Sequence, residues 1–274
     1  MPAINTNTAA NAAVRYLNIN SAQETSSLSK LSSGSRITSA SDDAAGLAIS
    51  TRISSDVTTL QQAATNASQA TAILQTADGG ASNISDILAR MKSLASESAS
   101  GTTTDSSRAY IQSEFSQLNS EIDSIATGTR YSGQSLLDGS SVFSSGVSVL
   151  VGSDGSDTIT ITLSSLTSSS LAVSSLDVST QSGATSALDA LDTAIDTVSA
   201  ARASIGAQES RFNFSSDSIS TQTQNLQAAN SAIRDVDIAA EQSKLSSAEV
   251  KTQAAVSALA AANQMPQYLL KLLG

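Results

Sequence analysis

Histidine, cysteine and tryptophan are absent from this 274-residue chain, which has only two prolines and 3% aromatic residues. Without His there is no imidazole base and no His metal ligand, and without Cys there is no thiolate nucleophile, zinc–thiolate site or disulfide. These absences exclude a Ser-His-Asp hydrolase and a His-dependent zinc enzyme. Carboxylate, Lys or Tyr chemistry remains open with few candidates, so we expect a non-catalytic protein without metal or cofactor.

Positive charge is also scarce, since 14 Lys and Arg stand against 24 Asp and Glu and give a net charge of −10. This balance argues against nucleic acid and against anionic membrane surfaces as partners. No apolar run approaches the roughly 18 residues of a membrane-spanning helix. The first basic residue is Arg15, and no basic segment leads into an apolar core as in a secretory signal peptide. On these rules alone the chain is expected in the cytosol.

Small residues dominate what is present. Ser occupies 56 positions and Ala 43. Leu, Ile, Val and Phe together make up about 22% of the chain, close to the lower limit for a globular core. A core built from small residues favours closely packed helices with narrow seams.

Helical periodicity over long distances is the strongest pattern. In the first half, apolar residues follow one another at alternating spacings of three and four, as in a coiled-coil seam. The pattern predicts a helix from Asp43 to about Ser98, roughly 80 Å long. Gly79 and Gly80 lie inside this helix and are expected to weaken it by about 1 kcal/mol each. The seam consists of Leu60, Ala63, Ala67, Ala70, Leu74, Ala77, Ala81, Ile84, Leu88, Met91 and Ala95.

The second half has a matching helix, predicted from about residue 184 to residue 233. Its companion seam turns polar at Gln208, Ser215 and Gln222. Two helices of similar length should pack antiparallel, and a third amphipathic helix is predicted over 105–126. The main seam of the second half repeats every seven residues, at Leu191, Val198, Ile205, Phe212, Ile219, Leu226 and Ile233.

The composition changes between the helical halves, where residues 131–201 contain no Lys or Arg. Alternating apolar residues predict two strands, beginning near Val147 and Thr158 and joined by a Gly- and Asp-containing turn, within a hairpin region of about 142–163. The Ser- and Thr-rich stretch 164–182 is predicted to be an exposed loop, either plain and solvated or O-glycosylated.

Both ends of the chain, residues 4–33 and 237–270, are predicted to be Ala-rich helices. Neither has a strong core of its own, so each is marginal as an isolated helix and is expected to fold on association. We expect their apolar residues to form a polymerisation interface. The candidates are Val14, Leu17, Leu28, Leu31, Leu245, Val256, Leu259, Leu269 and Leu270.

The predicted fold is mainly α: an elongated antiparallel helical bundle with a small β-hairpin, plus terminal helices that pair as an inner coiled coil. Its domains are an N-terminal inner helix with linker (1–42), the first part of a rod domain with the hairpin and the Ser- and Thr-rich loop (43–183), a C-terminal rod helix (184–235) and a C-terminal inner helix (236–274).

Several long motifs resemble bacterial flagellin. Residues 31–49 (LSSGSRITSASDDAAGLAI) are similar to its N-terminal signature, and the start Ile4-Asn-Thr-Asn7 is similar to the same family. Residues 226–241 (LQAANSAIRDVDIAAE) and the tail 261–267 (AANQMPQ) with the Leu residues that follow resemble its C-terminal half. The resemblance covers about residues 1–165 and 184–274, in order.

This resemblance implies a subunit that polymerises into the flagellar filament for swimming motility, with terminal helices lining the filament core and a helical rod outside them. It also implies export without a cleaved signal peptide, through the flagellar export apparatus with an export chaperone, so that the mature location becomes extracellular. Its other partners would be hook-associated and cap proteins. With only residues 140–183 where most flagellins carry large outer domains, this resembles a short form. A hook–filament junction protein and a secreted helical adhesin are the alternatives.

Two acidic motifs allow a chemical and a structural interpretation. The Ser41-Asp-Asp43 stretch resembles a paired-carboxylate site, but no acid–base partner is nearby, so we predict that Ser41 caps the long helix while Asp42 and Asp43 complement its dipole. Asp154 and Asp157 resemble part of a calcium loop, but no bidentate Glu follows, so a solvated hairpin turn is favoured.

Arg90, Leu94 and Glu114 match positions at which flagellins of several bacteria contact an innate immune Toll-like receptor. Ala89, Lys92 and Ser93 depart from the stimulating pattern, in which larger polar or acidic residues are usual. The alternative is that Leu94 packs in the seam while the two charged residues are solvated.

Overall fold

The computed structural model describes residues 6–273, without the side chains of residue 266 and residues 268–273. The chain divides into two compact units, unit 1 (residues 1–55 and 225–274) and unit 2 (residues 56–224). Both divisions fall inside long helices, namely α2 (Ala44–Ala99) and α5 (Gln181–Arg234). The predicted mainly α fold with an antiparallel bundle and a small hairpin is confirmed.

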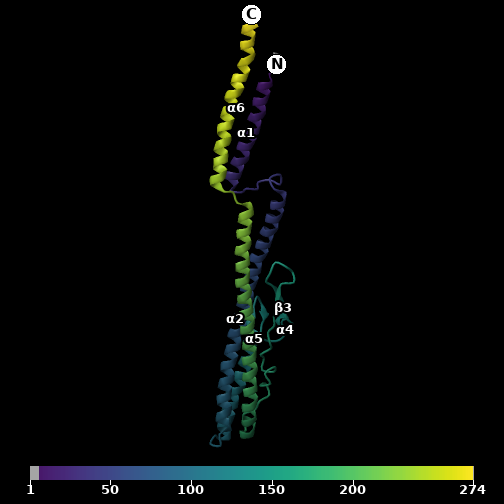
Figure 1. Ribbon diagram of the computed structural model, residues 1–274. Coiled ribbons are helices and arrows are strands. Elements are labelled where there is room, and N and C mark those ends of the chain that lie inside the picture. The colour runs from purple at the N-terminus through teal and green to yellow at the C-terminus, as the bar shows by residue number, and fades with distance from the viewer. Residues whose placement is uncertain (1–5, 274) are drawn as a thin grey trace. The chain divides into compact units, whose positions relative to one another are not determined.

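Unit 2 is built on α2, α5 and the shorter helix α3 (Asp105–Gly128). All eleven seam residues predicted in α2 are buried, and Leu191, Val198 and Ile205 of α5 belong to the same core. Ion pairs join Lys92 to Asp192 and Asp78 to Arg202. Because residue numbers fall along α2 as they rise along α5, the two helices run antiparallel in this unit (Figure 1).

Gly80 lies where another segment approaches α2 closely. A Cβ atom at this position would lie 2.5 Å from Thr129 Oγ1 and 2.9 Å from Leu137 Cδ1, whereas one at Gly79 would meet nothing within 4 Å. The approaching segment contains β1 (Arg130–Tyr131) and β2 (Gln134–Ser135), which pair antiparallel. Gly80 is therefore required by packing, while Gly79 carries only the expected cost in helix propensity.

The turn from α2 to α3 is held by a buried arginine. Arg108 Nε donates to the Ser98 carbonyl at 2.9 Å, and Nη2 donates to the Ser100 carbonyl at 2.9 Å. Its Nη1 also pairs with Asp105 Oδ1 at 2.8 Å. The Ser98 carbonyl lies in the last turn of α2 and lacks an intrahelical partner, so the guanidinium satisfies it. The Ser100 carbonyl, just beyond the helix, also accepts from the Thr103 N–H at 3.2 Å, so the guanidinium adds a second bond there.

The middle of the chain forms α4 (Val142–Ser145) and a second antiparallel pair, β3 (Val147–Leu150) with β4 (Thr158–Ile161). Residues 164–180 form no helix or strand, as the predicted loop requires, but the prediction that this loop is exposed is wrong, because aliphatic side chains spaced along it enter the core of unit 2. Its abundant Ser and Thr mask that pattern in the sequence. The buried residues are Leu166, Leu171, Val173 and Val178.

Unit 1 contains α1 (Thr8–Ser33) and α6 (Ile238–Leu273), which pack against each other. Asn7 Nδ2 donates to the Ala262 carbonyl at 2.7 Å, and Ser27 Oγ donates to Glu241 Oε1 at 2.8 Å, so the pair is antiparallel. The side chains buried along the pair are mostly small. They are Ala13 and Ser27 of α1, with Glu241, Leu245, Ala248, Ala255 and Ala262 of α6.

Candidate functional site

The outer surface of the α1–α6 pair carries large apolar side chains. Val14 is 41% exposed, Leu28 57% and Val256 48%. Because Ala and Ser occupy most of the internal contact, the pair buries its small residues and presents its larger ones to solvent. Contiguous exposed apolar surface is typical of protein interaction sites. Further members of this outer face, which sequence reasoning did not include, are Tyr16, Ile19, Ile238, Val250 and Met265.

The residues predicted as a polymerisation interface fall into four groups. Val14, Leu28 and Val256 are exposed, and Leu17, Leu31 and Leu259 are half-buried. Leu245 is 8% exposed, so its side chain is used within the chain and offers little surface to another molecule. Leu269 and Leu270 belong to α6, but their side chains lie outside the described part of the structure.

A buried carboxylate joins the two terminal helices. Glu241 is 5% exposed and accepts hydrogen bonds from Lys244 Nζ at 2.9 Å and from Ser27 Oγ at 2.8 Å. The hydrogen bond from Lys244, followed by that from Ser27, lowers the pKa of Glu241. No apolar pattern marks this residue, which is why the sequence did not single it out.

The segments that connect these helices to α2 and α5 are bonded to each other. Ser35 and Asp235 form an isolated antiparallel bridge, and the Arg36 backbone N–H donates to the Arg234 carbonyl at 2.6 Å. The Arg36 side chain adds a bond from Nη2 to the Ile233 carbonyl at 2.5 Å. It thereby satisfies an acceptor at the C-terminal end of α5, as Arg108 does for α2.

The predicted cap of α2 is shifted by two residues. Asp43, and not Ser41, caps the helix, because Asp43 Oδ1 accepts from the Gly46 N–H at 2.8 Å. Asp42 turns back to the linker, where hydrogen bonds from the Thr38 hydroxyl, the Thr38 N–H and the Ser39 N–H lower its pKa to about 2. Ser41 shares a hydrogen bond with the Ser39 hydroxyl. A carboxylate so firmly ionised stabilises the turn and is a poor proton donor.

The hairpin turn closes on its own acidic residues. Asp157 Oδ2 accepts from the Asp154 N–H at 3.3 Å, and Asp154 Oδ1 accepts from the Ser156 N–H at 3.3 Å. Within residues 6–273 there is no group of three or more His, Cys, Asp or Glu that could hold a metal ion.

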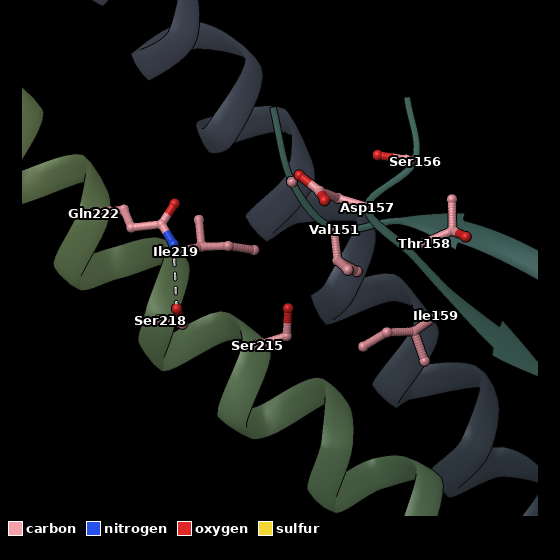
Figure 2. Close-up of a pocket in the computed structure, with 10 residues that line it drawn as sticks. Val151, Ser156, Asp157, Thr158, Ile159, Ser215, Ser218, Ile219 and Gln222 are labelled. Atoms are coloured by element: carbon pink, nitrogen blue, oxygen red, sulfur yellow. Dashed lines mark hydrogen bonds between the residues drawn. The ribbon is translucent and has the colours of Figure 1, made fainter. Parts of the chain in front are cut away.

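A polar side chain of α5 holds the hairpin where the companion seam becomes polar. Gln208 Oε1 accepts from the Thr162 N–H, and Gln208 Nε2 donates to the Thr162 carbonyl, both at 3.0 Å. The amide thus pairs with an edge of the hairpin as a neighbouring strand would. Beyond it, a groove of about 460 Å³ lies between α5 and the hairpin (Figure 2).

Of the three predicted receptor contacts, Leu94 is 2% exposed and packs in the core. Arg90 and Glu114 are accessible but already paired, with 2.6 Å between Arg90 Nη2 and Glu114 Oε1. This matches the seam interpretation of Leu94. Recognition of the chain by the immune receptor stays a prediction.

Comparison with known proteins connects this architecture to one family. Residues 4–142 match the bacterial flagellin N-terminal helical region, and residues 188–273 match the bacterial flagellin C-terminal helical region. A flagellin from Halalkalibacterium halodurans is 37% identical over 272 residues, which covers 98% of this chain and 99% of that protein.

Solved structures agree with that result. A crystal structure of Bacillus cereus flagellin is similar, with 29% identity and a TM-score of 0.52 over 61% of this chain and 94% of that one. A putative flagellar hook-associated protein from Vibrio parahaemolyticus shares the fold alone, at 15% identity and a TM-score of 0.60 over 71% of this chain and 100% of that one. No helix within the described residues is long and apolar enough to cross a membrane.

Proposed function

The chain belongs to the bacterial flagellin family, and from that premise we propose that copies of it polymerise through the outer faces of α1 and α6. Flagellins are structural proteins, and this chain is a structural subunit of the flagellar filament. The observation that carries the proposal is the inverted character of the terminal pair, with small residues inside and Val14, Leu28 and Val256 outside. Such a pair is suited to burial among further helices of the same kind.

The energetics of the terminal helices favour folding on assembly. Helix α1 has 26 residues and α6 has 36, and fixing each backbone residue costs roughly 1–2 kcal/mol. The narrow Ala-rich contact within one chain removes little apolar area from water, at about 25 cal/mol per Å². Contact with several neighbouring copies is needed to offset the cost. We therefore expect unit 2 to be folded in the monomer, and α1 and α6 to order on incorporation.

The remaining partners follow from family membership as part of this proposal. The chain would be exported through the flagellar export apparatus without cleavage of a signal peptide, accompanied by an export chaperone. It would reach the extracellular end of the filament and meet hook-associated and cap proteins there. It would act without catalysis, cofactor or metal.

A triple substitution tests the proposed interface. Val14→Ser, Leu28→Ser and Val256→Ser together remove apolar side chains from the outer face without touching the internal contact of the pair. We expect purified triple variant to form no filaments under conditions in which wild type does, with the same thermal unfolding of unit 2. A matched control, Ser26→Ala with Ser29→Ala and Ser257→Ala, changes exposed residues of the same helices and should polymerise normally.

Filament growth by the triple variant at the wild-type rate would contradict the proposed interface. Deletion of residues 237–274 gives an independent test, because the truncated chain should remain a soluble helical monomer.

A further inference from the structure

Three aspartates of this chain, Asp78, Asp138 and Asp154, are each followed directly by glycine. In such a pair the backbone nitrogen of the glycine can attack the side-chain carboxyl carbon of the aspartate, because glycine has no side chain to block the approach. The product is a cyclic succinimide. Since the glycine is common to all three pairs, large differences in their reactivity must come from the fold.

The first pair is restrained by a helix. Gly79 lies in the interior of α2, where backbone N–H groups donate to carbonyls four residues earlier, so its nitrogen can attack only when the helix opens locally. The Asp78 carboxylate is held as well, since it accepts hydrogen bonds from Arg202 Nε at 2.8 Å and from Arg202 Nη2 at 3.3 Å. We therefore expect the Asp78–Gly79 pair to be almost unreactive.

The second pair is restrained through its carboxylate. Asp138 Oδ2 accepts from the Ser140 hydroxyl at 2.7 Å, and Asp138 Oδ1 accepts from the Ser140 N–H at 2.9 Å. One carboxyl oxygen departs when a succinimide forms, so at least one of these hydrogen bonds must break. Both bonds, that from the hydroxyl first, lower the pKa of Asp138, and an ionised carboxylate loses an oxygen less readily than a carboxylic acid. Gly139 is also packed closely, because a Cβ added there would lie 2.7 Å from Ser165 Cβ.

The third pair is the least restrained. Asp154 and Gly155 are both exposed at the tip of the β3–β4 hairpin, and a Cβ added to Gly155 would meet nothing within 4 Å. Asp154 Oδ1 accepts a single hydrogen bond, the 3.3 Å bond from the Ser156 N–H. Within residues 6–273, no donor is bonded to Asp154 Oδ2 and no acceptor to the Gly155 N–H. The oxygen that must depart and the nitrogen that must attack are thus both available.

We propose that Asp154 is a site of spontaneous isomerisation, at which the aspartate becomes β-linked isoaspartate. The Gly155 nitrogen forms a bond to Asp154 Cγ while the bond from Cγ to Oδ2 breaks, and the departing hydroxyl takes the proton of that nitrogen and leaves as water. Water then adds to either carbonyl of the ring: addition at Cγ restores aspartate, and addition at the backbone carbonyl carbon gives isoaspartate. The step needs no oxidant, metal or enzyme, and the inference does not depend on polymerisation.

Isomerisation would change the tip of the hairpin and little else. The main chain would then pass through the Asp154 side chain and be longer by one carbon atom. The Asp154 carbonyl, which accepts from the Asp157 N–H at 3.0 Å and closes the turn, would become part of a free carboxylate. The strand pairing begins beyond the turn, at Leu150 and Thr158, and Gln208 holds the hairpin at Thr162. We therefore expect unit 2 to remain folded.

Peptide mapping of the aged protein tests the site. Purified wild-type chain is incubated in mildly acidic buffer and digested, and isoaspartyl peptides are separated by chromatography and identified by methylation with an isoaspartyl methyltransferase. Isoaspartate should accumulate at position 154 at least about fivefold faster than at position 138, the factor that one hydrogen bond is worth, and at least about tenfold faster than at position 78. In concentrated urea, which removes the fold, the three positions should react at similar rates.

Two variants check the cause. Gly155→Ala places a methyl group in open space, so unit 2 should melt as in wild type while isomerisation at position 154 slows because the added side chain hinders the nitrogen. Ser140→Ala removes the hydroxyl bonded to Asp138 and should accelerate isomerisation at position 138 about fivefold, with position 154 unchanged.

Equal rates at positions 154 and 138 in the folded chain, or a faster rate at position 78, would overturn the inference. The same ranking in urea would also overturn it, because the differences would then come from the local sequence and not from the fold. Each of these results is independent of whether the chain forms filaments, so the inference and the proposed function fail separately.

Discussion

The two adjacent glycines of α2 give a test in which a single methyl group has opposite effects at neighbouring positions. Gly79→Ala places the methyl group in open solvent, and Gly80→Ala places it 2.5 Å from Thr129 Oγ1. That oxygen is not free to move, because it donates a hydrogen bond to the Ile125 carbonyl at 2.7 Å. Leu137, the other neighbour of the added methyl group, is 1% exposed and belongs to the packed core of unit 2.

The expected magnitudes follow from two separable effects. Alanine is favoured over glycine in a helix interior by about 1 kcal/mol, and both variants gain this. Overpacking a filled core costs about 1–3 kcal/mol, and only Gly80→Ala suffers it. Gly79→Ala should therefore stabilise unit 2 by up to about 1 kcal/mol. Because the propensity gain cancels between the two variants, Gly80→Ala should be less stable than Gly79→Ala by about 1–3 kcal/mol.

Urea unfolding of the monomer, followed by circular dichroism, measures both values. The double variant Gly80→Ala with Thr129→Ala checks the cause, because removing the Thr129 hydroxyl and methyl should recover most of the loss attributable to the clash. Thr129→Ala alone supplies the reference, with an expected cost of about 1 kcal/mol for its hydrogen bond. The reasoning would be refuted if Gly80→Ala proved as stable as Gly79→Ala.

Three further predictions concern charge. Burial, followed by the nearby charge of Asp78, raises the pKa of Glu209, whose Oε1 is buried without a partner. The protonated Glu209 side chain therefore contributes stability in full below the usual pKa of 4.5, and this contribution is lost as pH rises through the raised pKa. Glu209→Gln should stabilise unit 2 at pH 7 and make its melting temperature vary less between pH 4 and pH 7. The pKa of Glu241 is lowered, so the dependence on pH has the opposite sign: the ionised Glu241 carboxylate stabilises the α1–α6 pair above pH 4.5, and this stabilisation is lost as pH falls through the lowered pKa. Filaments of Glu241→Gln should therefore be less sensitive to acid than wild-type filaments in a light-scattering titration. An unchanged titration profile would contradict this prediction. Salt screens the repulsion between copies of a chain with a net charge of −10, so polymerisation should be faster at about 0.3 M than at about 0.03 M salt; an equal or slower rate at the higher concentration would count against this effect of charge.

The bundle of unit 2 could be predicted from the sequence because its seam repeats at helical spacing. From Leu60 to Ala95 every predicted position is buried, even where the residue is alanine. Local periodicity is sufficient there, since each helix presents one continuous face to its partners. The same reasoning could not explain Gln208, whose partner Thr162 is 46 residues away in the chain. The polar break in the companion seam is visible in the sequence, but its meaning depends on a contact that only the fold creates.

The candidate interface could be predicted only in part from the sequence, because residue size and hydrophobicity alone do not tell the outer face of the α1–α6 pair from its internal contact. Selecting large apolar residues identifies Val14, Leu28 and Val256 on the outer face, but it also selects Leu245, which is buried within the pair. The internal contact uses Ala13, Ala255 and other small residues, and alanine is so common in this chain that it marks no face. Similarly, the Ser-rich stretch 164–182 conceals its buried aliphatic residues, because the Ser and Thr between them lower its average hydrophobicity.

Hydrogen exchange of wild-type chain as monomer and as filament tests the central claim most directly, because it reports on α1 and α6 without altering either helix. The account predicts that amides of residues 8–33 and 238–265 exchange rapidly in the monomer and become strongly protected in filaments, while the core of unit 2 is protected in both states. Equal protection of the terminal helices in monomer and filament would contradict the claim that their outer faces are buried by polymerisation.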